Sequence, residues 1–220
     1  MAQVFPKSSN TLSKASIVGA GVVAGAAGLV TLNLNRTTYV TTQSMPIDQV
    51  VQFTHTHHVG SLGIDCRFCH TSVEEAAFAG IPASKTCMGC HSVVWKDAPI
   101  LEPVRESYRT DMPVEWVRVH DLPEFVYFDH SIHVNKGIGC ESCHGRVDKM
   151  PLMMRQNSLN MEWCLACHRA PEQHLRPKDQ IFTMGWDPMQ ALGVSQEELG
   201  KKLKEENNVQ SRTNCATCHR

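Results

Sequence analysis

The chain has 220 residues, of which 42% are hydrophobic and 6% aromatic, and this length permits one or two domains. Its net charge is -1 at pH 7, so it has no basic excess for binding nucleic acid, and we exclude a nucleic-acid partner. The composition is unusual in its ten cysteines and twelve histidines.

An apolar segment lies near the N-terminus. The 21 residues between Lys14 and Arg36 carry no charge, and as a helix they rise about 31 Å, close to the roughly 30 Å hydrocarbon core of a bilayer. Many are glycine or alanine, and Ala24-Gly25-Ala26 resembles a signal-peptide cleavage site, which leaves a cleaved signal as the alternative. We expect an uncleaved transmembrane anchor helix over about residues 15–35, within an N-terminal segment 1–36.

The region after this segment, residues 37–220, has few long periodic apolar stretches, because prolines, glycines and histidines interrupt almost every run. We therefore expect mainly α-helical structure with much irregular structure and few strands. Short helices should end near the histidines described below.

An internal repeat occupies two parts of this region. The element Phe53-x-His55-x-x-His58 leads to a Cys-x-x-Cys-His unit, and a second such unit follows by residue 91. The element Phe128-x-His130-x-x-His133 leads in the same way to two units that end at residue 168. We interpret residues 53–91 and 128–168 as two modules with two units each.

A fifth unit stands alone in the C-terminal part, residues 186–220. Before it, Ser195-Gln196-Glu197-Glu198 has the pattern of a capping box and predicts a charged helix that runs to about Glu206. We expect this helix to be a solvated strut.

All ten cysteines fall in Cys-x-x-Cys-His units, which is the attachment signature of haem c. The two thiols of a unit bind the vinyl groups of one porphyrin, and the histidine becomes the proximal iron ligand. Zinc ribbons and thioredoxin-like sites do not require a histidine after each pair. The sequence therefore predicts a multihaem cytochrome c fold organised around five covalent haems. The attachment cysteines are Cys66, Cys69, Cys87, Cys90, Cys140, Cys143, Cys164, Cys167, Cys215 and Cys218, and the proximal histidines are His70, His91, His144, His168 and His219.

Haem c is attached outside the cytoplasm, so residues 37–220 should form an extracytoplasmic domain. Lys7 and Lys14 precede the apolar segment, while Arg36 is the one basic residue between it and Arg67. This asymmetry predicts a bacterial cytoplasmic-membrane protein with its N-terminus inside and its haem domain on the periplasmic face.

Seven histidines remain for the distal side of the irons. In each Phe-x-His-x-x-His element the two histidines lie on neighbouring faces of one helical turn and can reach two different haems. We predict His55, His58, His130 and His133 as distal ligands. His120 is the predicted fifth ligand, with His174, Met150 and Met184 as alternatives, and His57 is interpreted as a second-sphere or surface residue.

Irons with two strong ligands conduct electrons with little change of geometry, whereas an enzyme needs an open iron position. Since spare histidines outnumber the haems, we expect electron transfer and no catalytic residues in this chain.

The Phe-x-His-x-x-His elements resemble those of small multihaem cytochromes of the c3 and c7 type. The longer run from Trp116 through His130-Ser131-Ile132-His133 to Cys143 and on to Cys164-Leu165-Ala166-Cys167-His168 resembles the pentahaem cytochrome subunit of alternative complex III, a bacterial quinol oxidase. This resemblance covers about residues 50–220. It implies electron relay from quinol oxidation to a further cytochrome, a soluble carrier or a terminal oxidase. It also implies three kinds of partner subunit: an iron–sulfur protein, polytopic quinol-binding proteins and a monohaem cytochrome c.

The alternative is a membrane-anchored multihaem quinol dehydrogenase that feeds a periplasmic reductase. In that family the first haem unit lies close behind the membrane helix, whereas Cys66 here lies thirty residues beyond Arg36.

Overall fold

The computed structural model describes residues 4–219. The chain divides into two compact units, one ending at Thr42 and one beginning at Gln43.

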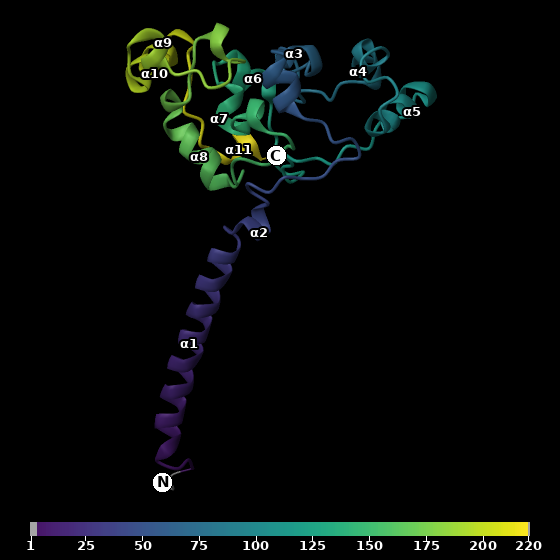
Figure 1. Cartoon of the computed structure of the whole chain (residues 1–220). Helices are drawn as coiled ribbons and strands as arrows, with labels where there is room; N and C mark the ends of the chain where they lie inside the picture. Colours follow the sequence, from purple (N-terminus) through teal and green to yellow (C-terminus); the bar gives the residue numbers. More distant parts are fainter. Residues whose placement is uncertain (1–3, 220) are drawn as a thin grey trace. The chain divides into compact units, whose positions relative to one another are not determined.

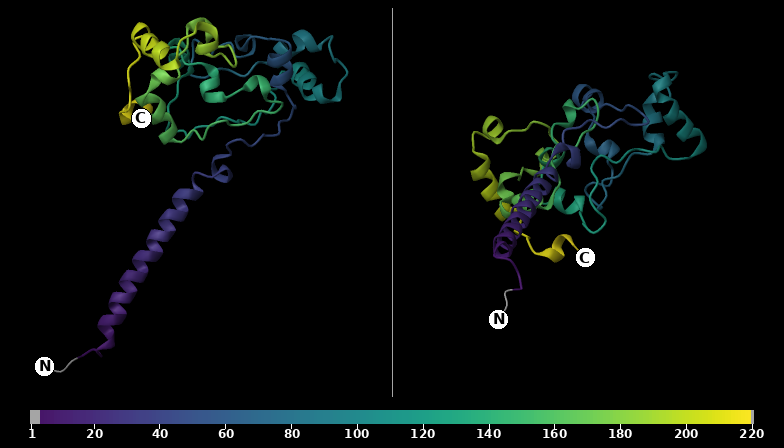
Figure 2. Two further views of the ribbon diagram at one scale, coloured as in Figure 1. Left: turned by 60° about the vertical axis from the view of Figure 1, so that its left-hand side comes forward. Right: turned by 90° about the horizontal axis from the view of Figure 1, so that it is seen from below.

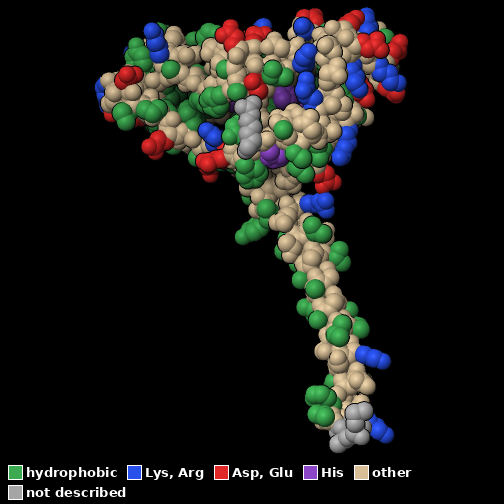
Figure 3. Space-filling model, turned by 180° about the vertical axis from the view of Figure 1, so that it is seen from behind, with side chains coloured by type: hydrophobic (Ala, Val, Ile, Leu, Met, Phe, Trp, Pro, Cys, Tyr) green, Lys and Arg blue, Asp and Glu red, His purple; other side chains and the backbone are tan. Residues whose placement is uncertain are grey.

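The first unit consists of the long helix α1 (Ser8–Leu34) and the short helix α2 (Thr38–Thr41) (Figure 1). Helix α1 begins before the predicted start near residue 15, because no proline or glycine interrupts the chain between Pro6 and Gly19. Its most apolar stretch has a mean hydropathy of 1.9, and none of that stretch is buried within the protein. Among the described residues it is the one helix whose length and composition suit a membrane span. Figure 3 shows lysine and arginine side chains near the two ends of this helix.

The second unit is built of short helices joined by long irregular segments (Figure 2). Five helices carry the cysteine units: α3 (Cys66–Cys69), α4 (Ser84–His91), α7 (Cys140–His144), α8 (Met161–Arg169) and α11 (Cys215–Cys218). The other α-helices are α5 (Glu102–Thr110), α6 (His130–Asn135), α9 (Pro188–Leu192) and α10 (Gln196–Glu206). A π-helix, η1 (Thr56–Ser61), and four 3₁₀ turns, η2 (Pro99–Leu101), η3 (Val147–Lys149), η4 (Pro171–Gln173) and η5 (Lys178–Gln180), complete the described elements.

The described residues form no strand, and three isolated β-bridges are the only extended pairing among them. The prediction of a mainly helical chain with much irregular structure is therefore confirmed. Each cysteine unit forms a helix that ends at, just before or one residue beyond its histidine, also as predicted.

The apolar core of the second unit is divided into three small clusters. The first is centred on Val51, Leu101 and Val104, the second on Val73, Val134 and Ile181, and the third on Leu175, Leu199 and Leu203. Attachment cysteines pack against two of these clusters, Cys87 against the first and Cys140 against the second. The polypeptide thus buries little apolar surface by itself around the cysteine units.

The two Phe-x-His-x-x-His elements differ in one respect. The second forms the α-helix α6, whereas the first forms the π-helix η1, with a bond from the Leu62 amide to the His57 carbonyl. Seven residues separate His58 from Cys66, but six separate His133 from Cys140. A π-turn accommodates one extra residue, so the wider turn absorbs this insertion.

Helix α10 begins as the sequence predicted, since the Ser195 hydroxyl accepts a bond of 3.2 Å from the Glu198 amide. The expectation that it is a solvated strut is wrong. Leu199, Gly200 and Leu203 are buried, and this face packs on η4 and on Leu175. The three residues are separated by one, three and four positions and therefore lie on one side of the helix. This apolar face is difficult to recognise in the sequence because most of the neighbouring residues are charged.

Candidate functional site

The five cysteine units present their side chains in a shared way. A helical turn places the two cysteines of each unit three residues apart, and therefore on one side of the helix. The histidine follows directly at the end of the same turn. None of the ten thiols forms a disulfide in the described chain. We number the five units in chain order as sites 1 to 5, after His70, His91, His144, His168 and His219.

Backbone carbonyls hold four of the five proximal imidazoles. The Nδ1 atoms of His70, His91, His168 and His219 donate to carbonyl oxygens at 2.7, 2.9, 2.7 and 3.1 Å. Since a carbonyl oxygen can only accept, the proton must lie on Nδ1, and Nε2 keeps a free lone pair. This is the tautomer that binds a metal through Nε2.

The two Phe-x-His-x-x-His turns share one geometry. The Nδ1 atoms of His58 and His133 donate to carbonyls four residues earlier, at 2.9 and 2.6 Å. Each turn also carries a phenylalanine stacked on its second histidine. The ring centroids are 4.4 Å apart for Phe53 and His58 and 4.5 Å apart for Phe128 and His133. The sequence repeat is thus a repeat in three dimensions.

Three of these histidines face a proximal histidine at a distance suited to a metal between them. A metal–imidazole nitrogen bond is about 2 Å long, so two imidazoles on opposite sides of one metal have centroids roughly 6 Å apart. The observed distances are 6.2 Å for His58 and His91, 6.3 Å for His130 and His144, and 6.0 Å for His133 and His168. Sites 2, 3 and 4 therefore fit an iron with two imidazole ligands.

The predicted distal histidine of site 1 is His55. Burial and, to a smaller extent, the neighbouring His70 and His58 lower the pKa of His55 to about 4. The buried Nδ1 atom of His55 has no hydrogen-bond partner among the described residues. An unpartnered buried nitrogen is costly, so this ring suits a bound group.

His144 lies at the centre of the histidine cluster. Burial and, to a smaller extent, the neighbouring His120, His130, His70 and His55 lower its pKa to about 3. A histidine in this environment is neutral at pH 7 and can offer a lone pair to a metal.

The remaining ligand candidates are His120, His174, Met150 and Met184. The His120 ring lies 4.3 Å from His144, too close for a metal between these two rings. Its buried Nε2 atom has no partner among the described residues. His174 is half-buried, and burial lowers its pKa. Met150 is 2% exposed, and Met184 is half-buried. The distal ligand of site 5 stays a prediction.

Sequence reasoning missed the carbonyl groups that orient the imidazoles. Three of these carbonyls come from distant segments. The Ala77 carbonyl orients His130, the Arg212 carbonyl orients His168, and the Phe125 carbonyl orients His219. Every residue has a carbonyl, so no residue type signals this role. Sequence reasoning also missed the contacts of Glu141. Its carboxylate accepts a hydrogen bond from the Gly185 amide at 2.6 Å and one from the Arg176 guanidinium at 3.2 Å.

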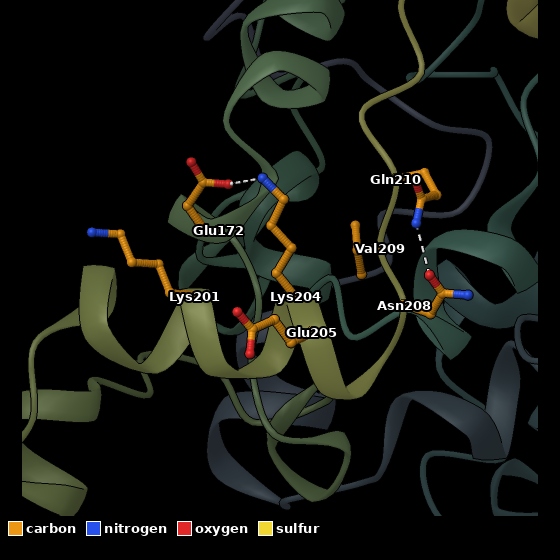
Figure 4. Close-up of a pocket in the computed structure, with 7 residues that line it drawn as sticks. All are labelled: Glu172, Lys201, Lys204, Glu205, Asn208, Val209 and Gln210. Atoms are coloured by element: carbon orange, nitrogen blue, oxygen red, sulfur yellow. Dashed lines mark hydrogen bonds and ion pairs between the residues drawn. The ribbon is translucent and has the colours of Figure 1, made fainter.

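An open pocket beside α10 lies apart from this chemistry. It has a volume of about 640 Å³ and is lined by Glu172, Lys201, Lys204, Glu205, Asn208, Val209 and Gln210 (Figure 4). Lys204 is paired with Glu172 at 2.8 Å. The lining contains neither histidine nor cysteine, so we do not assign it to the functional site.

Comparisons with known proteins agree with this chemistry. Residues 126–220 match the family described as cytochrome c7 and related cytochrome c. The chain is also 30% identical over 149 residues to the multihaem cytochrome c subunit of a menaquinone reductase from Nitratidesulfovibrio vulgaris. That match covers 58% of this chain and 70% of the relative.

Proposed function

Because this chain belongs to the multihaem cytochrome c family, we propose that it is the pentahaem electron-transfer subunit of a membrane complex that exchanges electrons with quinone. The observation that carries the proposal is the pairing of imidazoles at about 6 Å at sites 2, 3 and 4. A haem whose iron has two imidazole ligands carries one electron and has no open position for a substrate.

The proposed ligand set follows the repeat. Each of the five Cys-x-x-Cys pairs holds one haem by two thioether bonds, and the next histidine binds its iron. The first histidine of each Phe-x-His-x-x-His turn completes the first site of its module, and the second histidine completes the second site. His55, His58, His130 and His133 thus serve sites 1, 2, 3 and 4.

Site 5 takes its distal ligand from His120, with His174, Met150 and Met184 as alternatives. His120 is supported by its buried, unpartnered Nε2 atom. Since no metal fits between His120 and His144, His120 must serve an iron other than that of site 3. A methionine at this position would raise the reduction potential of site 5 above those of its bis-histidine neighbours.

We propose that the complex is a quinol-oxidising one of the alternative complex III type. The electrons would pass to a further cytochrome, a soluble carrier or a terminal oxidase. The partners would be an iron–sulfur protein, polytopic quinol-binding subunits and a monohaem cytochrome c, and α1 would anchor the chain in the cytoplasmic membrane with the haem domain in the periplasm. Support comes from the apolar helix Ser8–Leu34 and from the resemblance of residues 50–220.

A second candidate has the opposite direction of electron flow. The relative from Nitratidesulfovibrio vulgaris is a subunit of a menaquinone reductase, which favours delivery of electrons from the periplasmic side to menaquinone. The haem arrangement serves both directions equally, because electron transfer between haems is reversible. An anchored quinol dehydrogenase that feeds a periplasmic reductase is the third possibility.

The test is to purify the native complex from membranes through a tag on this chain and to identify its subunits. We expect about five haems per chain in a pyridine haemochrome assay, together with an iron–sulfur subunit and polytopic membrane proteins. Anaerobic addition of menaquinol, or of a reduced periplasmic cytochrome followed by menaquinone, then decides the direction. A complex without quinone-linked electron transfer would overturn the proposal.

A further inference from the structure

We propose that the two modules meet at sites 1 and 3, so that the first four sites follow the order 2–1–3–4 and site 5 adjoins the second module. This inference rests on the proposed function, because it concerns how electrons cross a chain that holds five haems. Sequence order alone suggests 1–2–3–4–5, with the modules joined at sites 2 and 3.

A single loop, residues 71–80, joins sites 1 and 3. It follows directly after His70, and its Gly80 carbonyl accepts from the Nδ1 atom of His70 at 2.7 Å. In the same loop, the Ala77 carbonyl accepts from the Nδ1 atom of His130 at 2.8 Å and from its amide at 3.2 Å. One loop therefore orients the proximal imidazole of site 1 and the distal imidazole of site 3.

The helical turns of the two sites also pack on each other. Helix η1, which begins directly after His55 and carries His58, packs on η3, which begins three residues after His144. A Cβ atom at Gly60 would overlap the Asp148 carbonyl, so the two backbones are in close contact there. The Thr56 amide donates to the Met150 carbonyl at 3.3 Å.

A third contact joins the two attachment helices through residues 181–182. The Arg67 guanidinium of α3 lies 4.4 Å from the centre of the Phe182 ring, and the Cys140 amide of α7 donates to the Ile181 carbonyl at 3.2 Å. Residues 181–182 therefore contact the attachment helices of both site 1 and site 3.

Within each module, one helical turn joins the two sites. His58 faces site 2, and His55, the proposed ligand of site 1, lies three residues before it; His130 and His133 face sites 3 and 4.

Site 5 is joined to site 4 by the segment that precedes α11. The Arg212 carbonyl accepts from the Nδ1 atom of His168 at 2.7 Å, and the Ser211 hydroxyl donates to the His168 carbonyl at 2.6 Å. At the opposite end, α4 of site 2 packs mainly on α5 and on the cluster of Val51, Leu101 and Val104.

The order has a direct consequence for electron transfer. Each step oxidises one iron and reduces the next without breaking a bond. The step between modules runs between sites 1 and 3. A partner protein that exchanges electrons with site 2 would therefore reach the second module through site 1.

The experiment uses histidine-to-methionine variants of the full-length holoprotein in detergent, with the potential of each haem followed by NMR during a redox titration. A methionine ligand raises the potential of its own haem, so that haem stays reduced while its neighbours titrate. The electron retained on that haem adds a negative charge, which lowers the reduction potentials of adjacent haems. This effect weakens with distance. The variants H55M, H58M, H130M and H133M each identify their own site by the largest rise, and site 5 is the remaining one.

We expect H130M to lower the potentials of sites 1 and 4 and to leave site 2 unchanged. A lowered potential at site 2 without one at site 1 would show that the sites follow the order of the sequence, and it would overturn the proposal. H133M is the matched control, because both orders predict lowered potentials at sites 3 and 5. If H130M loses its haem, H55M decides: the proposed order predicts shifts of sites 2 and 3, and sequence order predicts a shift of site 2 alone.

Failure of the proposed function would look different. Fewer than five haems, or mostly high-spin iron, in the unsubstituted chain would contradict the haem assignment whichever sites respond. With five low-spin haems present, the pattern of shifts tests the order alone.

Discussion

At the scale of single residues, hydrogen bonds to backbone carbonyls determine the chemistry of the histidines. Seven histidines of the described chain donate from Nδ1 to a carbonyl, namely His58, His70, His91, His130, His133, His168 and His219. Such a bond fixes both the tautomer and the ring plane, and it leaves Nε2 free to bind iron. These seven include four of the five predicted proximal ligands and three of the predicted distal ones.

The first prediction concerns two neighbouring histidines. His58 faces His91, with centroids 6.2 Å apart, whereas His57 is exposed and stacks on Trp95. We expect H58A to convert one iron to a five-coordinate, high-spin state and to remove about one fifth of the low-spin signal, because one of five sites loses a strong ligand. Electron paramagnetic resonance and the visible spectrum measure this change.

H57A is the control for this experiment and should leave the low-spin signal unchanged. Equal spectra for H58A and the unsubstituted protein would contradict the assignment of His58.

At the scale of elements, local packing decides what the sequence patterns leave open. The two Phe-x-His-x-x-His turns keep the same ring contacts although one is a π-helix and the other an α-helix. The insertion is absorbed before Gly63, whose φ of +65° matches the positive φ of Gly137 in the second module. Glycine adopts this conformation without strain, so both turns lead into their cysteine units alike.

The second prediction concerns Gly200, where helix α10 meets η4. A Cβ atom at this position would overlap the backbone carbonyl of Glu172. Alanine favours a helix over glycine by about 1 kcal/mol, yet overpacking against a fixed backbone typically costs roughly 1–3 kcal/mol. We expect G200A to lower the free energy of unfolding despite its better helix propensity, as measured by guanidinium denaturation followed by circular dichroism.

The neighbouring K201A variant is the control, because Lys201 is exposed and its ion pair with Glu197 lies on the surface. An exposed pair of this kind contributes roughly 0–1 kcal/mol. If G200A were as stable as K201A, this result would contradict the close contact between α10 and η4 at Gly200.

At the scale of the whole molecule, the chain combines an apolar helix with a domain whose polypeptide core is small. The three core clusters are built around three buried residues each, and Cys87 and Cys140 pack against two of them. The stretch from residue 15 to 35 contains no ionisable side chain. It therefore offers no group that could accept the protons released when quinol is oxidised.

The third prediction follows from this absence of proton acceptors. We expect the isolated holoprotein, free of partner subunits, to show no rapid haem reduction when menaquinol is added anaerobically. The absorbance of reduced haem c measures the reaction in a stopped-flow instrument. Dithionite, added afterwards, should reduce all haems and so demonstrates that they are competent. Fast reduction by menaquinol alone would place quinol oxidation within this chain.

Much of this protein could be predicted from the sequence, because its chemistry depends on covalent spacing. A Cys-x-x-Cys-His unit forms one helical turn whatever surrounds it, so the predicted short helices ending near each histidine were confirmed, as were the mainly helical fold and the membership of the multihaem cytochrome c family. The Ser195 cap of α10 was predicted for the same reason, since it involves residues three positions apart.

The tertiary structure decided the contacts between distant residues. It buried one face of α10, brought His120 beside His144, and joined site 1 to site 3 through the loop 71–80. The sequence could not reveal these features, because they depend on backbone carbonyls and on the close approach of segments far apart in the chain. The repeat indicates which histidines belong to one module, but the packing between modules determines which sites are neighbours.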